Sequence, residues 1–409
     1  MKEGASVRVG IIGGGAAGLI CACSLAKNKK IDVTVFEKNE RVGKKLLSTG
    51  NGRCNLTNLS ATAKDYYGSG EFVAPAFEKY PPKSNIAFFE SLGLFTRADS
   101  EGRVYPMSNQ ASSVLDALRF ECERLGVRFL CSCDIKNVKI NNKKYVLNNG
   151  YTFEKLVFAC GGKAAVKDYS SFSLLFVFGH TVTKTAPSLV RLITDDRMTK
   201  QLKGIRAVVS MTLFSGNRKI VTERGEMLFS DFSLSGIISM QLSSYISHLK
   251  QQGKNNFSVS VDFVPDISES EFTALLFKLS KRSAVKAENL LSGFMPKKIG
   301  ICLLKKVGIS PEEEIKKVPK NQLALLSDLC KNCVFKITDV GSFSQAQVMV
   351  GGVKKNEFNE NTLESKKQKG VYCCGEMLDV DGKCGGYNLQ WAFSSGRLVA
   401  ESIISECEK

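Results

Sequence analysis

Three glycines near the N-terminus have the spacing of a pyrophosphate-binding turn. Gly13, Gly15 and Gly18 form a G-x-G-x-x-G pattern. The first glycine permits a tight turn, the second lets backbone N–H groups approach a pyrophosphate, and the third lets a helix pack closely on a strand. A helix start also presents unpaired N–H donors to an anion. The pattern predicts a dinucleotide site, and the alternative is a glycine-rich turn that binds nothing.

Two apolar segments give these glycines the context that such a site needs. Residues 7–12 predict a strand directly before the turn, and residues 31–36 predict a second strand. The second strand ends at Glu37, nineteen residues after Gly18, where a carboxylate can accept hydrogen bonds from both ribose hydroxyls. An acid there favours the unphosphorylated adenosine ribose of FAD or NAD over NADP.

A second glycine-rich stretch near the C-terminus favours FAD over NAD. Residues 371–374 predict a buried strand, and a glycine-rich loop then leads into a predicted helix at 388–404. The positive end of that helix suits the N1–C2=O edge of a flavin ring, where negative charge gathers on reduction. NAD needs one glycine-rich loop, whereas FAD needs one site for its ADP half and another for its ring.

Between the two ends, the composition changes twice. Residues 127–160 predict a β-meander, and residues 182–264 alternate as strands of a separate β-rich domain. Helices follow, with a capping box at Ser268-x-x-Glu271 and a second helix start at Ser310-Pro311. Residues 38–58 lack a regular period and predict a long ordered loop.

The charge of the chain is strongly positive. Its 409 residues have a formal net charge of +17, which indicates either a polyanionic partner or a lysine-rich solvated surface. The predicted helical block is densely basic, as a solvated face or a nucleic-acid surface would be, but few aromatic residues are interleaved. Its basic residues include Lys278, Lys281, Arg282, Lys286, Lys297, Lys298, Lys305, Lys306, Lys316, Lys317 and Lys320.

Cysteine content and hydropathy bear on metals and location. Fourteen cysteines in a chain of this size predict free thiols, and the C-x-x-C of Cys330 and Cys333 has no second pair to complete a zinc site. No apolar run reaches the ~20 residues of a membrane span. The predicted first strand begins too early for a signal peptide. We expect a cytoplasmic protein with no metal and no membrane segment; the sequence does not indicate an oligomeric state.

Four segments resemble, one after another, a family of bacterial FAD-binding oxidoreductases, the predicted or aminoacetone-oxidase-like flavoproteins. These segments are RVGKKLLSTGNGRCNLTN, EGRVYPMSNQASSVLDAL, APSLVRL and GEMLDVDGKCGGYNLQWAFSSG. The resemblance implies an α/β fold with a Rossmann-like FAD-binding domain formed by both chain ends, residues 1–185 and 350–409. It also implies an inserted β-barrel-like domain, residues 186–265 and 335–349, and a nested helical domain, residues 266–334.

Carried over motif by motif, the resemblance implies an FAD site assembled from distant parts of the chain. To this set the sequence adds Gly161, which follows an apolar segment, and Arg53, which we assign to the pyrophosphate rather than to an anionic substrate. The expected FAD contacts are Gly13, Gly15, Ala17, Gly18, Glu37, Lys38, Asn51, Gly52, Arg53, Cys54, Val138, Gly161, Gly375, Glu376, Asp379, Gly386, Asn388 and Leu389.

Family members resemble NAD(P)H-dependent reductases of two kinds of substrate, a uracil in ribosomal RNA and a steroid or bile-acid enone. Both reactions deliver a hydride to an electron-poor alkene carbon and a proton to its neighbour. The charge favours ribosomal RNA, with the small enone as the alternative. A second alternative is an FAD-bearing redox or partner-binding module without a dedicated substrate.

The sequence suggests a proton donor but no site for the reductant. Cys54 is the expected donor, with Tyr387 and Cys384 as alternatives, and Cys54 can instead serve only to pack against FAD. No second complete G-x-G-x-x-G follows a predicted strand. NAD(P)H is therefore expected to dock transiently.

Overall fold

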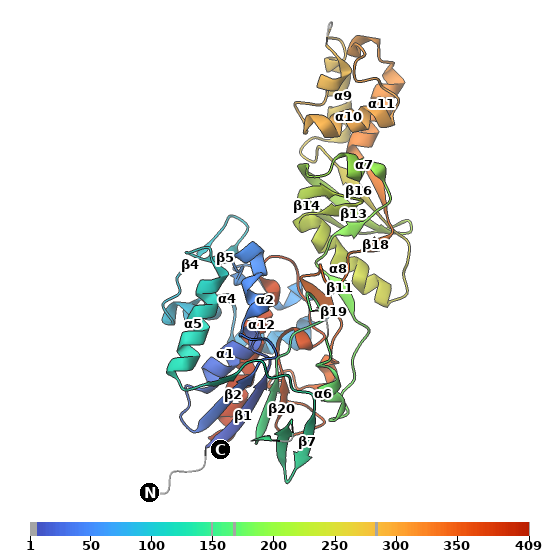
Figure 1. Cartoon of the computed structure of the whole chain (residues 1–409). Coiled ribbons are helices and arrows are strands. Elements are labelled where there is room, and N and C mark those ends of the chain that lie inside the picture. The colour runs from blue at the N-terminus through green and yellow to red at the C-terminus, as the bar shows by residue number, and fades with distance from the viewer. Residues whose placement is uncertain (1–5, 149, 167–168, 283–284, 409) are drawn as a thin grey trace. The chain divides into compact units, whose positions relative to one another are not determined.

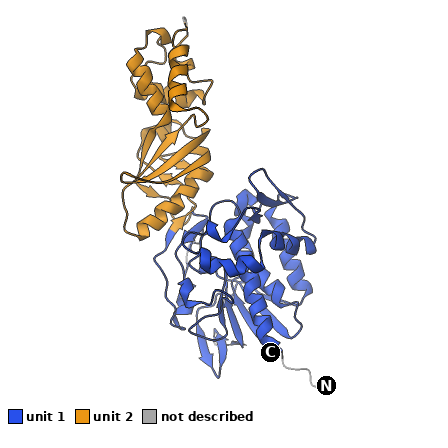
Figure 2. Cartoon of the chain, turned by 180° about the vertical axis from the view of Figure 1, so that it is seen from behind, with its two compact units in different colours: residues 1–186, 346–409 blue, residues 187–345 orange. Residues whose placement is uncertain are grey.

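The computed structural model describes residues 6–148, 150–166, 169–282 and 285–408, and the chain divides into two compact units (Figures 1 and 2). Unit 1 comprises residues 1–186 and 346–409, and unit 2 comprises residues 187–345. Both ends of the chain therefore belong to unit 1. The finer division into three domains stays a prediction.

Unit 1 is built on a five-stranded parallel sheet with the strand order β20-β10-β1-β2-β6. Its C-terminal strand, β20, pairs in parallel with β10, so residues from both ends of the chain complete one sheet. The strands are β1 (Val7–Ile12), β2 (Ile31–Phe36), β6 (Arg128–Leu130), β10 (Lys155–Phe158) and β20 (Val371–Cys373). The sheet confirms the predicted α/β, Rossmann-like fold class.

The helices of unit 1 include α1, directly after β1, and the long C-terminal helix α12, which lie beside the sheet in Figure 1. Each of these two helices begins directly after a glycine-rich turn. The helices are α1 (Ala16–Leu25), α2 (Lys44–Leu47), α3 (Gly70–Lys79), α4 (Pro82–Ser91), α5 (Ala111–Arg124), α6 (Ser173–Phe176) and α12 (Tyr387–Cys407).

Two small antiparallel sheets complete unit 1. They are β3-β5-β4, from Thr57–Asn58, Arg103–Pro106 and Thr96–Ala98, and β7-β8-β9, from Val138–Asn141, Lys144–Leu147 and Tyr151–Phe153. The predicted meander at 127–160 is thus only partly right, because β6 and β10 flank it in the parallel sheet. The predicted loop at 38–58 contains α2 and β3.

Unit 2 contains a seven-stranded antiparallel sheet, with the order β17-β16-β13-β14-β15-β12-β18, and several helices. The strands are β12 (Leu192–Ile193), β13 (Arg206–Ser215), β14 (Arg218–Ser230), β15 (Ser233–Ser235), β16 (Phe257–Asp262), β17 (Cys333–Ile337) and β18 (Asp339–Val340). The helices are α7 (Arg197–Gln201), α8 (Ile237–Gln251), α9 (Glu269–Leu279), α10 (Lys297–Lys306) and α11 (Lys320–Lys331). Two further strands, β11 (Ala186–Ser188) and β19 (Val348–Val350), lie near the unit boundaries in sequence.

Three expectations for unit 2 have different outcomes. The capping box is confirmed, because the Ser268 hydroxyl accepts from the Glu271 N–H at the start of α9. The helix expected at Ser310-Pro311 is wrong, since this stretch instead makes backbone hydrogen bonds to residues 285–288. The strand-rich stretch at 182–264 also contains the helix α8, which the alternating pattern did not indicate.

A buried histidine links two segments of unit 1. His180 lies with Nδ1 2.8 Å from Glu357 Oε2 and Nε2 2.8 Å from Ser365 Oγ. The Ser365 oxygen also accepts the N–H groups of Lys367 and Gln368, at 3.0 and 2.9 Å. Its own proton therefore points to Nε2, and His180 is neutral with its proton on Nδ1. Burial lowers the pKa of His180 more than the Glu357 carboxylate raises it.

This cluster predicts a loss of stability in acid. The unfolded chain takes up a proton on His180 near pH 6.5, whereas the folded chain takes it up only at a lower pH. Stability contributed by neutral His180 is therefore present above pH 6.5 and falls as the pH drops through the folded pKa. The slope is at most about 1.4 kcal/mol per pH unit.

The measurement is thermal unfolding of the wild type and His180→Gln between pH 8 and pH 5. We expect a smaller pH dependence of the unfolding midpoint in His180→Gln. His248→Gln, which removes the second of the two histidines, is the control and should keep the wild-type dependence. The same dependence in wild type and His180→Gln would contradict the assignment.

Candidate cofactor and active site

In the glycine turn between β1 and α1, some glycines pack against backbone atoms and another faces open space. A Cβ on Gly13 would lie 2.4 Å from the Ala159 carbonyl oxygen, and one on Gly18 would lie 2.0 Å from the Gly13 carbonyl oxygen. Gly15, in contrast, has no atom within 4 Å of its Cβ position. Helix α1 begins there without a side-chain cap and without an acid in its first turn. Its first N–H groups are therefore suited to an anion.

Glu37 lies against this turn, at the end of β2. Its Oε2 accepts the Gly14 N–H at 3.0 Å, and its Oε1 accepts the Asn39 N–H at 2.9 Å. These bonds hold the carboxylate in place beside the turn. Lys38 follows directly in the chain. The position of Glu37 suits the expected contact with the ribose, and this contact stays a prediction.

The loop after α2 has an unusual backbone. Gly50, Asn51, Gly52 and Cys54 all have positive φ, at 56°, 55°, 82° and 59°. Glycine accepts this region freely, whereas a residue with a side chain pays on the order of 1–2 kcal/mol. Such conformations concentrate at functional sites. The expected residues Asn51, Gly52 and Cys54 thus have a left-handed backbone conformation, which is unfavourable for Asn51 and Cys54.

The Cys54 thiol is fully buried within this loop. Burial raises its pKa to about 12, although a hydrogen bond from Thr49 opposes the shift. Cys384 behaves similarly, since burial raises its pKa to about 11 against the effect of nearby Arg103. Both thiols are therefore protonated at neutral pH and can act as acids rather than as nucleophiles. The third candidate, Tyr387, is the first residue of α12, and its carbonyl accepts the Tyr66 hydroxyl at 2.6 Å.

An ion pair connects the loop after β2 to the C-terminal motif. Lys45 of α2 lies 2.7 Å from Glu376 Oε2, while Glu376 Oε1 accepts the Met349 N–H at 2.9 Å. Gly161, with φ of 69°, has Glu376 Oε2 3.9 Å from its Cβ position. Two of the expected residues, Gly161 and Glu376, are thus neighbours. Lys45 is not predicted from the sequence, because no local pattern shows which distant acid a lysine will meet.

The start of α12 is shaped by its own glycine loop. Gly386 has φ of 101°, and a Cβ there would lie 2.5 Å from the Thr57 carbonyl. Asn388 closes the loop: its Oδ1 accepts the Gly382 N–H at 2.9 Å and its amide donates to the Gly382 carbonyl at 3.0 Å. Asp379 Oδ2 accepts the Thr183 hydroxyl at 3.0 Å. Asn388 therefore acts at least partly by positioning the loop.

One buried acceptor at this end has no partner among the described residues. Asn55 Oδ1 is inaccessible to solvent and receives no hydrogen bond, and it would lie 2.8 Å from a Cβ on Gly386. An unsatisfied buried acceptor costs about 1–3 kcal/mol, so a donor on a bound group is expected there. Asn55 is not among the residues expected from the sequence, although it follows Cys54 directly.

These features fit FAD. The α1 turn offers open space and free N–H groups for a pyrophosphate, with Glu37 beside it. The Asn55 oxygen suits an N–H of a flavin ring, and α12 starts beside it with no capping side chain and no acid in its first turn. Ala17 joins the two ends, since a Cβ on Gly375 would lie 2.9 Å from the Ala17 Cβ. The FAD contacts expected of Val138, in β7, and of Leu389, in the first turn of α12, stay predictions.

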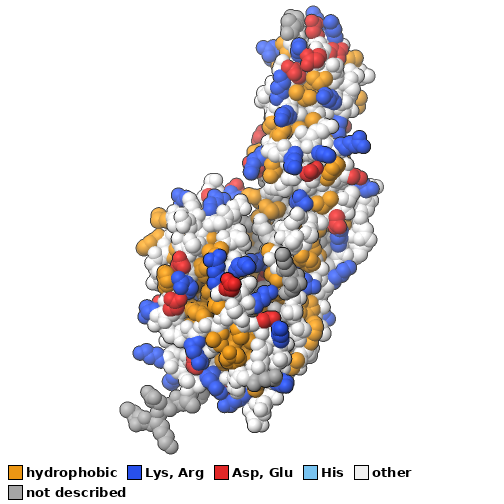
Figure 3. Space-filling model, viewed as in Figure 1, with side chains coloured by type: hydrophobic (Ala, Val, Ile, Leu, Met, Phe, Trp, Pro, Cys, Tyr) orange, Lys and Arg blue, Asp and Glu red, His pale blue; other side chains and the backbone are white. Residues whose placement is uncertain are grey.

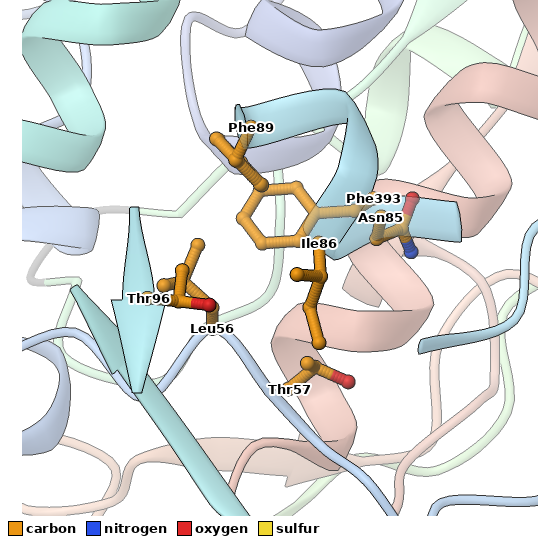
Figure 4. Close-up of a pocket in the computed structure, with 7 residues that line it drawn as sticks. All are labelled: Leu56, Thr57, Asn85, Ile86, Phe89, Thr96 and Phe393. Atoms are coloured by element: carbon orange, nitrogen blue, oxygen red, sulfur yellow. The ribbon is translucent and has the colours of Figure 1, made fainter. Parts of the chain in front are cut away.

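A small apolar pocket in unit 1 is not a substrate site. It lies where α4, α12 and β4 meet, and Figure 4 shows Phe89 and Phe393 there. The centres of these two rings are 5.0 Å apart. The pocket has no room for a water molecule, so it is a gap in the packing. Its lining residues are Leu56, Thr57, Asn85, Ile86, Phe89, Thr96 and Phe393.

The fold and its paired glycine turns define an FAD-dependent oxidoreductase of the Rossmann-like α/β class. Residues 7–402 match the family described as the HI0933-like protein Rossmann domain, and the chain belongs to that family. Within the described residues, no helix is long and apolar enough to cross a membrane, and no three metal-binding side chains are grouped to hold an ion.

Three relatives match nearly end to end. The 3-dehydro-bile acid delta(4,6)-reductase of Clostridium scindens is 35% identical over 97% of this chain and 98% of its own. The ribosomal RNA dihydrouridine synthase of Haemophilus influenzae is 30% identical over 96% of this chain and 97% of its own. The enzyme of the same name from Escherichia coli is 29% identical over 97% of both chains.

The contrast between Gly15 and Gly18 gives a test of the FAD site. The Cβ of Gly15→Val meets no protein atom within 4 Å, and residue 15 has an ordinary φ of −84°, so we expect a folded protein. Its side chain would fill the space for the pyrophosphate, and FAD affinity should fall at least about 10-fold. FAD content is read from the absorbance near 450 nm of the purified protein.

Two variants make the test specific. Gly293→Ala, in unit 2, also meets open space and should keep the wild-type FAD content. Gly18→Ala should instead lower the unfolding temperature, because its Cβ collides with the Gly13 carbonyl. Full FAD content in Gly15→Val would place the cofactor elsewhere.

Proposed function

We propose that this protein uses NAD(P)H and FAD to reduce uridine in ribosomal RNA to dihydrouridine. The observation that carries the choice of substrate is the net charge of +17. Unit 2 has 23 Lys and Arg residues against 15 Asp and Glu, and unit 1 has 34 against 25, so both units share the excess. A neutral steroid gives no reason for this charge, whereas a nucleic acid gains affinity from it by counterion release. Such a substrate puts the activity in the cytoplasm.

The basic helical block does not by itself account for RNA binding. Residues 266–334 contain twelve Lys and Arg but also eight Asp and Glu. Lys297 pairs with Glu288 at 2.9 Å, and Lys306 pairs with Asp196 at 2.8 Å. Lysines and arginines are spread over the face seen in Figure 3 rather than gathered over one element. This mixture favours a solvated surface for the block, so an RNA contact is expected elsewhere on the protein.

The residues of the chain have three tasks in this reaction. Bound FAD, once reduced, supplies the hydride for the electron-poor carbon of the uracil C5=C6 bond. The start of α12 provides the positive end of a helix dipole for charge that develops beside it. A buried acid then supplies the proton to the neighbouring carbon, and we assign this task to Cys54, whose thiol stays protonated at neutral pH.

A small conjugated enone is the second candidate substrate. It is favoured by the bile-acid reductase of Clostridium scindens, which at 35% is more similar to this chain than either dihydrouridine synthase quoted above. The chemistry is the same hydride and proton addition, so the candidate site fits both. Charge separates them, because an enone has no phosphate backbone to neutralise.

Ribosomal RNA from a deletion strain tests the substrate. We expect mass spectrometry to show the loss of dihydrouridine from this RNA, and its return when the wild-type gene is restored. A deletion strain that receives the gene for the Gly15→Val variant instead should still lack dihydrouridine in this RNA. Unchanged dihydrouridine in the deletion strain, together with turnover of a steroid enone by the purified holoenzyme, would transfer the proposal to the enone.

The proton donor is tested with Cys54→Ala. Removing a general acid should lower substrate turnover by about 100-fold or more. Bleaching of the flavin by NAD(P)H, followed by absorbance, does not need this proton and serves as an internal reference. Cys384→Ala is the matched control for a second buried thiol. A larger loss in Cys384→Ala than in Cys54→Ala would reassign the donor to Cys384.

A further inference from the structure

The outer face of the β3-β5-β4 sheet presents exposed side chains of a particular mixture. Side chains alternate along β5, so Val104 and Pro106 are buried while Tyr105 points outward. The strand register pairs Tyr105 with Arg97 of β4. One step along the same face, the Met107 N–H donates to the Phe95 carbonyl at 2.9 Å. Phe95, Arg97, Tyr105 and Met107 therefore share one surface.

The apolar members of this face are largely in solvent. Phe95 is 62% exposed and Met107 is 63% exposed, and they are cross-strand neighbours. Single exposed apolar residues are normal on protein surfaces, but adjacent large ones indicate a binding surface. We call Phe95, Arg97, Tyr105, Met107 and the overlying Arg53 the hairpin platform.

Two arginines of the hairpin platform keep their charge available. The Arg53 guanidinium lies 4.9 Å from the centre of the Tyr105 ring, as in a cation–π contact. We therefore give Arg53 the role toward an anionic substrate, in place of the pyrophosphate contact expected from the sequence. Among the described residues, no carboxylate forms an ion pair with Arg53 or Arg97. Arg103, in contrast, is paired with Asp99 at 2.8 Å and with Glu101 at 2.9 Å. The platform thus combines two aromatic rings with two cations that have no ion-pair partner. This combination complements a negatively charged ligand that also carries flat, apolar ring systems.

The hairpin platform adjoins the candidate site. A Cβ on Gly50, in the left-handed loop, would lie 3.6 Å from the Tyr105 ring. On the other side, a Cβ on Gly385, in the loop before α12, would lie 3.6 Å from Arg103 Cδ. The two loops expected to contact FAD therefore both border β5. A polymer lying on the platform would pass beside the place where reduction occurs.

We propose that the hairpin platform binds the single-stranded nucleotides that flank the target uridine. Bases stack on aromatic rings regardless of sequence, and arginines take the phosphates between them. A uracil must leave its stacked position before its C5=C6 bond can meet another ring, and its neighbours then need a new surface. The inference rests on the proposed function, because a free enone has no flanking nucleotides.

The test measures RNA affinity of the full-length FAD-bound protein. Fluorescence anisotropy with a labelled oligouridine of about 16 nucleotides gives the Kd, and a salt series gives its electrostatic part. We expect Phe95→Ala/Arg97→Ala to weaken binding about 10-fold to 100-fold. Arg97→Gln alone should lower the slope of log K against log salt by about 0.7, as for one phosphate contact to a single strand.

A matched double variant controls for surface charge and apolarity. Lys139→Ala/Ile140→Ala removes one exposed lysine and one apolar residue, 48% exposed, from the β7–β8 hairpin of the same unit. It should bind the oligouridine like the wild type. FAD content and unfolding temperature report whether each variant is folded. If the double platform variant is not folded, Arg97→Gln decides.

The outcomes distinguish a failure of the platform proposal from a failure of the proposed function. Wild-type affinity in both platform variants would overturn the platform, while loss of dihydrouridine in the deletion strain would still support the function. An equal loss of affinity for a duplex RNA of the same length would overturn base stacking. A wild-type protein that binds no oligouridine and leaves ribosomal RNA unmodified would overturn the function itself.

Discussion

The close contact between α1 and α12 is the constraint on which unit 1 depends. A Cβ on Gly396 would lie 2.6 Å from the Ala17 carbonyl oxygen, so the helices meet backbone to backbone. Nearby, the Trp391 indole donates to the Gly375 carbonyl at 3.1 Å, and the Ser395 hydroxyl accepts the Gly375 N–H at 2.9 Å. Any side chain at position 396 would separate the glycine turn from the C-terminal loop. One cofactor can use both only because this contact is closed.

Charge acts differently in different parts of the chain. In the helical block eight acids offset most of the twelve positive charges, as at Lys297 and Glu288. Around the candidate site, Lys45 is held by Glu376, while Arg53 lies on a ring without an acid. Net charge is a property of the whole chain, whereas recognition depends on which cations lack a partner. The structure identifies those residues, and the composition alone does not.

The sequence predicts those features that follow from neighbouring residues. The turn at Gly13 to Gly18 and the capping box at Ser268 are local, and both form as expected. The expected helix at Ser310-Pro311 fails because its backbone groups bond to residues 285–288, which no local pattern reveals. Asn55 and Lys45 were missed for the same reason. Their roles come from an unsatisfied oxygen and from an acid 331 residues away.

The His180 cluster shows how hydrogen-bond counting can separate look-alike geometries. A serine, a histidine and a glutamate are joined by two contacts of 2.8 Å, which is the arrangement of a hydrolytic triad. In this protein the serine oxygen already accepts two backbone N–H groups, so both of its lone pairs are occupied. An oxygen without a free lone pair is no nucleophile. A geometric template alone would assign this flavoenzyme a second, hydrolytic activity that its own backbone amides forbid.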